Sequence, residues 1–164
     1  MQHHELNQTL LPQLSTYLNV KVQLDAEGMA YFKAGDFFVC LRHLEINHSL
    51  HIFTELANPA DFQTSDLEQI YIYLLQLNCF HNQVGDGNLG LTLNEDAVYY
   101  SVKLAETVDS VTLCDKMKLF LTTLQQLHTS LAAFVQNLNK KTQNPSSDPN
   151  ANIPAHLNFF QFMC

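Results

Sequence analysis

The sequence predicts an α+β fold with a helix, a three-stranded antiparallel meander, a second helix, a β-hairpin and a long C-terminal helix. Three observations carry this prediction. Leucines recur every four residues near the start, strand-like runs follow between residues 29 and 56, and apolar residues alternate in steps of four and three from Leu113 to Leu138. With 164 residues, of which 46% are hydrophobic, the chain has the size and composition of one globular domain.

The first helix is predicted over residues 5–18. Leu6, Leu10, Leu14 and Leu18 lie four residues apart and share one face. Pro12 predicts an end or a kink inside this helix, because proline removes a backbone donor and clashes with the preceding turn.

Three strands are predicted at residues 29–33, 37–44 and 49–56, with Gly28, Gly35 and Asn47 at the turns. In the second strand, residues 37, 39, 41 and 43 share one face, and residues 38, 40, 42 and 44 share the other. Because neither face is simply polar, we expect both to be covered.

The second helix is predicted to begin at a capping box formed by Ser65 and Glu68. Its body, from Leu67 to Leu77, is apolar on more than one stripe, which a single sheet cannot cover. The extra apolar surface predicts contact with a second copy of the chain. The alternative is a helix enclosed within one monomer.

The rest of the chain is predicted to hold a polar loop at residues 85–90, a hairpin of strands 89–93 and 98–104, and the long helix. That helix fits a single amphipathic helix on a sheet, with a coiled-coil seam as the alternative. We expect residues 1–139 to form the domain. Residues 140–164 are expected to be a polar linker and a short apolar tail that docks on this chain or a neighbour.

Composition restricts the partners. Eight basic against 16 acidic residues give a net charge of −8, which disfavours nucleic acid and anionic membranes. No apolar run is long enough to span a bilayer and the N-terminus has no secretory pattern, so we expect a cytoplasmic protein. Cys40, Cys79 and Cys114 are expected to be buried small hydrophobes.

A search for catalytic motifs predicts no enzyme, no metal and no cofactor. His43, His48 and His51 cluster near one predicted turn but lack the paired spacing of a zinc site, so a metal-dependent enzyme is the minor alternative. Gly85, Gly87 and Gly90 match a dinucleotide motif only in spacing, because the run follows a helix and enters a strand.

Three stretches carry a resemblance to a known family: Gly28 to Phe32, Leu50 to Ala57, and Leu89 to Asn94 followed by Val98 to Leu104. Together with the order of elements and the acidity, they resemble the class I chaperones of bacterial type III secretion, the Tir chaperone family. The resemblance covers about residues 5–138.

The resemblance implies a homodimer that binds the N-terminal chaperone-binding segment of a secreted effector in extended form, without ATP, and keeps the effector soluble and secretion-competent. It places effector contacts, each with plain core packing as the alternative, at Leu10, Leu14, Phe32, Phe38, Cys40, Leu44 and Ile52. It places the dimer contact at Ile70, Tyr71, Ile72 and Leu74. The alternative function is a stand-alone stress or regulatory protein with the same fold.

Overall fold

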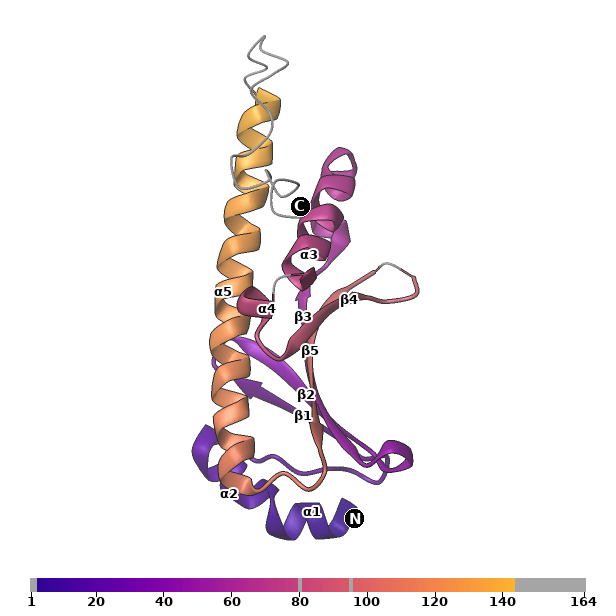
Figure 1. Cartoon of the computed structure of the whole chain (residues 1–164), viewed down its shortest axis with the longest axis vertical. Helices are drawn as coiled ribbons and strands as arrows, with labels where there is room; N and C mark the ends of the chain where they lie inside the picture. The colour runs from indigo at the N-terminus through magenta and orange to yellow at the C-terminus, as the bar shows by residue number, and fades with distance from the viewer. Residues whose placement is uncertain (1–2, 80, 95, 144–164) are drawn as a thin grey trace, which may run out of the picture.

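A computed structural model describes residues 3–79, 81–94 and 96–143 of the chain. Its centre is a five-stranded antiparallel sheet with the strand order β1-β2-β3-β5-β4 (Figure 1). The strands are β1 (Met29–Ala34), β2 (Phe37–Leu44), β3 (Ser49–Ala57), β4 (Gly87–Leu91) and β5 (Val98–Ala105). The predicted meander is confirmed, and the predicted hairpin extends the same sheet because β5 pairs with β3.

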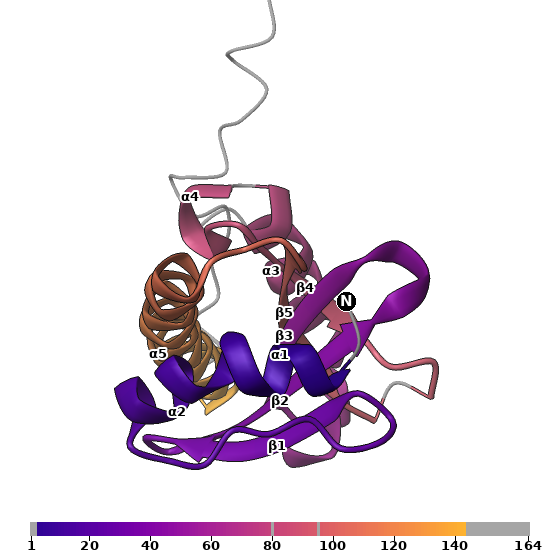
Figure 2. The same cartoon turned by 90° about the horizontal axis from the view of Figure 1, so that it is seen from below.

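The helices are α1 (His3–Thr9), α2 (Leu11–Leu18), α3 (Leu67–Cys79), α4 (His81–Val84) and α5 (Ser110–Gln143), and short 3-10 turns span Glu45–Asn47, Pro59–Asp61 and Thr64–Asp66. In Figure 2, α1 and α2 lie over β1 and β2, with α5 beside them. Helix α3 lies against β4 and meets α5 where the rings of Tyr73 and Phe134 stack with centroids 4.2 Å apart.

The predicted first helix is two helices. The break falls at Leu10, just before Pro12, and Pro12 lies in the first turn of α2. Proline is tolerated there because the first-turn amides have no partner within the helix. Asn19 ends α2 in the left-handed conformation, and its N–H bonds to the carbonyls of Ser15 and Thr16.

The predicted capping box at the start of α3 is wrong. The hydroxyl of Ser65 donates to the Oδ1 atom of Asp66 at 3.2 Å, within the 3-10 turn Thr64–Asp66 that precedes the helix. Helix α3 therefore begins at Leu67. An N-cap residue has a non-helical backbone, whereas Ser65 lies inside the 3-10 turn that leads into α3, so it does not occupy the capping position.

The predicted polar loop at residues 85–90 is also wrong in part, since Gly87 to Gly90 belong to strand β4. Helix α4 was not predicted, because four residues are too few to show helical periodicity. Cys40 is buried as expected, but Cys79 is exposed and Cys114 is only partly buried.

The long helix is confirmed and extends through residue 143, four residues into the predicted linker; residues 144–164, with the predicted apolar tail, lie outside the described residues. Its 34 residues span about 51 Å. Its buried stripe packs on the sheet core as a single amphipathic helix, through Leu113, Met117, Phe120, Leu124, Leu127, Leu131 and Leu138.

Candidate client-binding surfaces

The described helices cover one face of the sheet and leave the other face exposed. Helices α1, α2 and α5 lie on one side of the sheet (Figure 2). Val39 and Leu41 of β2 are buried in one core with residues of these helices. Phe38 points to the opposite side and is 77% exposed, and Tyr31 on β1 is 72% exposed. The expectation that both faces are covered is therefore wrong for a single chain, since this outer face has no helix over it in the described part of the chain.

The outer face carries an aromatic patch, defined here as Tyr31, Phe38, Phe53 and Tyr99. Tyr31 lies opposite Cys40 and Cys40 lies opposite Phe53, so these three form one row across the sheet. The rings of Phe53 and Tyr99 meet edge to face at 6.1 Å.

Cys40 lies within this row but is itself buried. Burial raises the pKa of its thiol to about 11, which leaves the thiol neutral and apolar in character. The patch thus presents two exposed and two half-buried aromatic side chains on one face, and exposed apolar surface of this kind marks interaction sites on proteins.

Strand β1 offers a free edge beside the patch. Within the described residues β1 pairs only with β2, and alternate residues of an antiparallel strand turn their N–H and C=O groups away from the partner strand. At Met29 both groups are used by Asp25, whose Oδ1 accepts at 2.9 Å and whose N–H donates at 2.8 Å. At Tyr31 and Lys33 the outward edge has no strand beside it, so an extended segment can pair there.

The opposite edge of the sheet is protected. The side-chain amide of Asn78 on α3 donates to the Leu89 carbonyl at 2.8 Å, and its oxygen accepts from the Leu89 N–H at 2.7 Å. This pair of bonds covers the middle of β4, as proteins commonly do to block unwanted strand pairing. Of the two edges, β1 is the one open to another chain.

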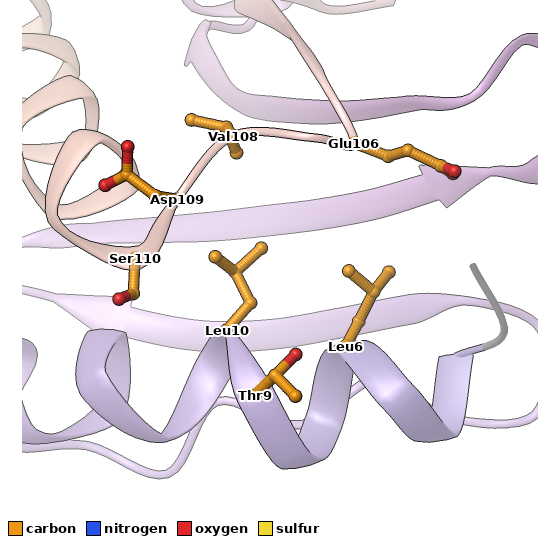
Figure 3. A pocket seen from close by; sticks show the side chains of 7 residues that line it. All are labelled: Leu6, Thr9, Leu10, Glu106, Val108, Asp109 and Ser110. Carbon is orange, nitrogen blue, oxygen red and sulfur yellow. The ribbon is translucent and has the colours of Figure 1, made fainter.

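A separate pocket of about 160 Å³ lies between α1 and the connection from β5 to α5 (Figure 3). Leu6 and Thr9 line it from α1 and Leu10 from the break between α1 and α2, and Val108 faces them from the connection. The polar end of the pocket includes Glu106. Such a mixed lining suits an apolar side chain that carries a polar neighbour.

Glu106 joins two histidines beside this pocket. Its Oε2 lies 2.9 Å from Nε2 of the buried His43, and its Oε1 lies 3.1 Å from Nδ1 of His48. These hydrogen bonds, the one with His43 above all, lower the pKa of Glu106 to about 2. His51 lies on the outer face instead, so the three histidines do not converge, and no group of three possible metal ligands occurs among the described residues.

The Glu106 cluster gives an acid-dependent stability. A carboxyl group whose pKa falls on folding stabilises the folded state at every pH above its ordinary pKa of 4.5. This stabilisation is lost as the pH falls from 4.5 toward the folded-state pKa of about 2. We expect Glu106→Gln to lower the free energy of unfolding at neutral pH and to flatten its dependence on pH below 4.5. Urea unfolding over that range measures both effects, with the exposed Glu68→Gln as control. A variant as acid-sensitive as the parent protein would contradict this assignment.

The predicted effector contacts fall into two groups. Phe38 and Cys40 lie on the outer face, with the half-buried Leu44 further along β2. Leu10 lines the pocket of Figure 3 with most of its surface buried. The other three are buried in the core of the monomer: Leu14, Phe32 and Ile52. Sequence reasoning missed Tyr31, Phe53 and Tyr99, although each alternates with a core residue in its strand.

The predicted dimer contacts are divided in the same way. Ile70 and Leu74 are buried within the monomer, whereas Tyr71 is half-buried and Ile72 is 48% exposed. The predicted dimer contacts do not include Leu75, which belongs to the extra apolar surface of this helix and is 64% exposed. An apolar pocket of about 110 Å³ between α3 and β4 joins this surface to β4, and its lining includes Tyr71, Leu75, Leu89 and Leu91.

Comparisons with solved structures define the class of fold. The chain is similar to a chain of the HopA1–SchA chaperone–effector complex, with 15% identity, coverage of 80% of this chain and 97% of that one, and a TM-score of 0.58. It is similar to a chain of the ExsC–ExsE complex, with 15% identity, coverage of 81% and 95%, and a TM-score of 0.61. It is also similar to a chain of the Yersinia pestis type III secretion chaperone SycH in complex with a stable fragment of YscM2, with 17% identity, coverage of 71% and 95%, and a TM-score of 0.51. The fold is that of type III secretion chaperones.

The sequence itself gives the family. Residues 9–140 match the model of the Tir chaperone protein (CesT) family, and the chain belongs to that family. The predicted resemblance is thereby confirmed. No curated protein matches the chain significantly. Among the described residues, no helix is both long and apolar enough to cross a membrane.

Proposed function

We propose that this chain is a cytoplasmic type III secretion chaperone that binds the N-terminal segment of a secreted effector in extended form and keeps it soluble and secretion-competent. The observation that carries the proposal is the exposed aromatic patch beside the free edge of β1. An extended segment pairs with such an edge through backbone hydrogen bonds and gains specificity from side-chain pockets, the mode known as β-augmentation.

The work of such a chaperone is binding alone, with no catalysis and no cofactor. Phe38, Cys40 and Leu44 are the predicted contacts that we keep for the outer face, and Leu10 is the one that we keep for the pocket of Figure 3. The core residues Leu14, Phe32 and Ile52 hold these surfaces from beneath. The apolar surface of α3 and β4 forms the homodimer contact.

Co-expression with the product of a neighbouring large reading frame tests the function. We expect the full-length protein, when tagged, to retain that product through affinity and size-exclusion steps. If no such product is retained, and none is kept soluble by co-expression, the proposal is wrong. A retained partner that is not exported would favour the stand-alone regulatory alternative.

Phe38→Asp tests the surface. Phe38 is 77% exposed in the free chain, and a bound client would cover it. In Phe38→Asp the client would instead have to bury a carboxylate against aromatic rings, which is costly. We therefore expect retention of the client to fall by about tenfold or more. Ile46→Asp is the matched control, because Ile46 is 93% exposed in the turn after β2 and lies outside the patch. Equal loss of binding in both variants would contradict the assignment.

A further inference from the structure

The outer face holds a cationic row, defined here as Arg42, His51 and Lys103. Arg42 of β2 lies directly opposite His51 of β3, and His51 lies directly opposite Lys103 of β5. The chain has only eight Lys and Arg residues and a net charge of −8, so two basic side chains flanking a histidine on one row is an unusual placement.

Nothing in the described part of the chain neutralises this row. Neither Arg42 nor Lys103 forms an ion pair within 4.0 Å there. Asp25 binds the N–H groups of Glu27 and Met29 at the β1 end of the row, and Glu55 lies opposite Tyr99 on β5, two rows from Lys103. Arg42 and Lys103 lie on strands β2 and β5, about 10 Å apart on either side of His51, so a partner's carboxylate placed over His51 is attracted by both.

The state of His51 reflects the same positive potential. Burial lowers its pKa first, and the charges of Lys103 and Arg42 lower it further. Its Nε2 lies 3.2 Å from the hydroxyl of Ser49, whose own proton is donated to Asn47, so Nε2 is the donor to Ser49. A carboxylate placed over the row would relieve the repulsion and favour the protonated ring.

The cationic row lies next to the aromatic patch. Arg42 and Cys40 are two residues apart on β2, as are His51 and Phe53 on β3, so the cationic row and the row through Tyr31 are about 7 Å apart. An extended segment crossing this face can therefore place apolar side chains on the patch and neighbouring acidic side chains on the row.

We propose that the client segment which crosses the outer face carries acidic side chains next to its apolar ones, and that Arg42 and Lys103 select it. This inference rests on the proposed chaperone function and adds the chemistry of the client. The aromatic patch beside the row separates such a segment from a simple anion. The net charge of −8 opposes a polynucleotide.

Synthetic peptides of about 12 residues test the inference, because that length spans a face of this size in extended form. Three peptides share the same Phe and Leu residues and carry Asp, Ser or Lys two residues away from them, so that in an extended chain both kinds of side chain point to the same side. We expect the Asp peptide to bind the full-length protein about tenfold more tightly than the Ser peptide, with the Lys peptide weakest. Binding of the Asp peptide is also expected to raise the pKa of His51, measured by NMR titration.

Charge variants make the test specific to the row. Arg42→Gln with Lys103→Gln is expected to remove the preference for the Asp peptide, and both side chains are exposed, so the fold is retained. Lys21→Gln with Lys118→Gln is the matched control, because it removes the same charge from exposed positions outside the sheet and is expected to keep the preference.

Each other outcome overturns the inference in a recognisable way. If the three peptides bind with equal affinity, the outer face binds apolar side chains but does not select a client by its charge. Two results would show that the row is a general anion site. One is an Asp peptide that keeps its affinity after its apolar residues are changed to Ala. The other is polyuridylate that competes with the Asp peptide as well as unlabelled Asp peptide does. If no peptide binds while the co-expressed client is retained, the inference is wrong and the proposed function stands. If the client is not retained either, the proposed function fails as well.

Discussion

Gly87→Ala is expected to lower the free energy of unfolding by about 2–4 kcal/mol, since overpacking and a lost hydrogen bond add together. A Cβ atom at Gly87 would lie 2.3 Å from Cε2 of Tyr100, so the ring must move. That ring is buried, its hydroxyl donates to the Val84 carbonyl at 2.9 Å, and it stacks on Phe120 with centroids 5.0 Å apart. The displacement therefore disturbs the core and the end of α4 together.

Gly90→Ala is the matched control in the same strand. A Cβ atom there meets nothing within 4 Å, and we expect a change in the free energy of unfolding of less than about 1 kcal/mol. Urea unfolding of the three proteins measures the difference. Equal stabilities for the two variants would contradict the packing described for Tyr100.

If the proposed homodimer forms through α3 and β4, Leu75→Asp is expected to raise its dissociation constant by about 100-fold or more, because a carboxylate would be buried in that apolar contact without a partner. Leu75 is 64% exposed in the single chain and lines the pocket between α3 and β4. The substitution changes little inside the monomer, so its effect is expected on assembly rather than on folding. Sedimentation equilibrium over a range of protein concentrations measures the constant.

Leu119→Asp is the control for this prediction. Leu119 is 46% exposed in the interior of α5, so the change carries a similar cost in helix propensity, but Leu119 is not part of the lining of the pocket between α3 and β4. A parent protein that stays monomeric, or a Leu75→Asp variant that stays dimeric, would contradict the assignment of this surface.

Much of the fold could be predicted from the periodicity of the sequence. The strand Phe37–Leu44 was predicted to the residue, and the long helix was predicted by its regular apolar spacing. The failures have local physical causes. Ser65 lies inside a 3-10 turn and so does not form the predicted cap. Position 87 is a glycine within a strand because the Tyr100 ring fills the space where a side chain would be, and a glycine of this kind reads as a loop in the sequence.

The site could be predicted less well, because alternation along a strand separates two faces without saying which one is covered. Phe32 and Phe38 are equally apolar in sequence, yet Phe32 is buried in the core with leucines of the N-terminal helices, whereas Phe38 stays 77% exposed with the Lys33 ammonium over its ring. The cationic row needed the strand register as well, since Arg42 and Lys103 are far apart in sequence and meet only across β3.

Hydrogen exchange of the complex with its co-purified client tests the central claim most directly. If an extended client segment pairs with the free edge of β1, the amides of Tyr31 and Lys33 gain strong protection in the complex, while the amide of Leu89, already bonded to Asn78, changes little. Unchanged exchange along β1 in a complex that nevertheless forms would contradict the account.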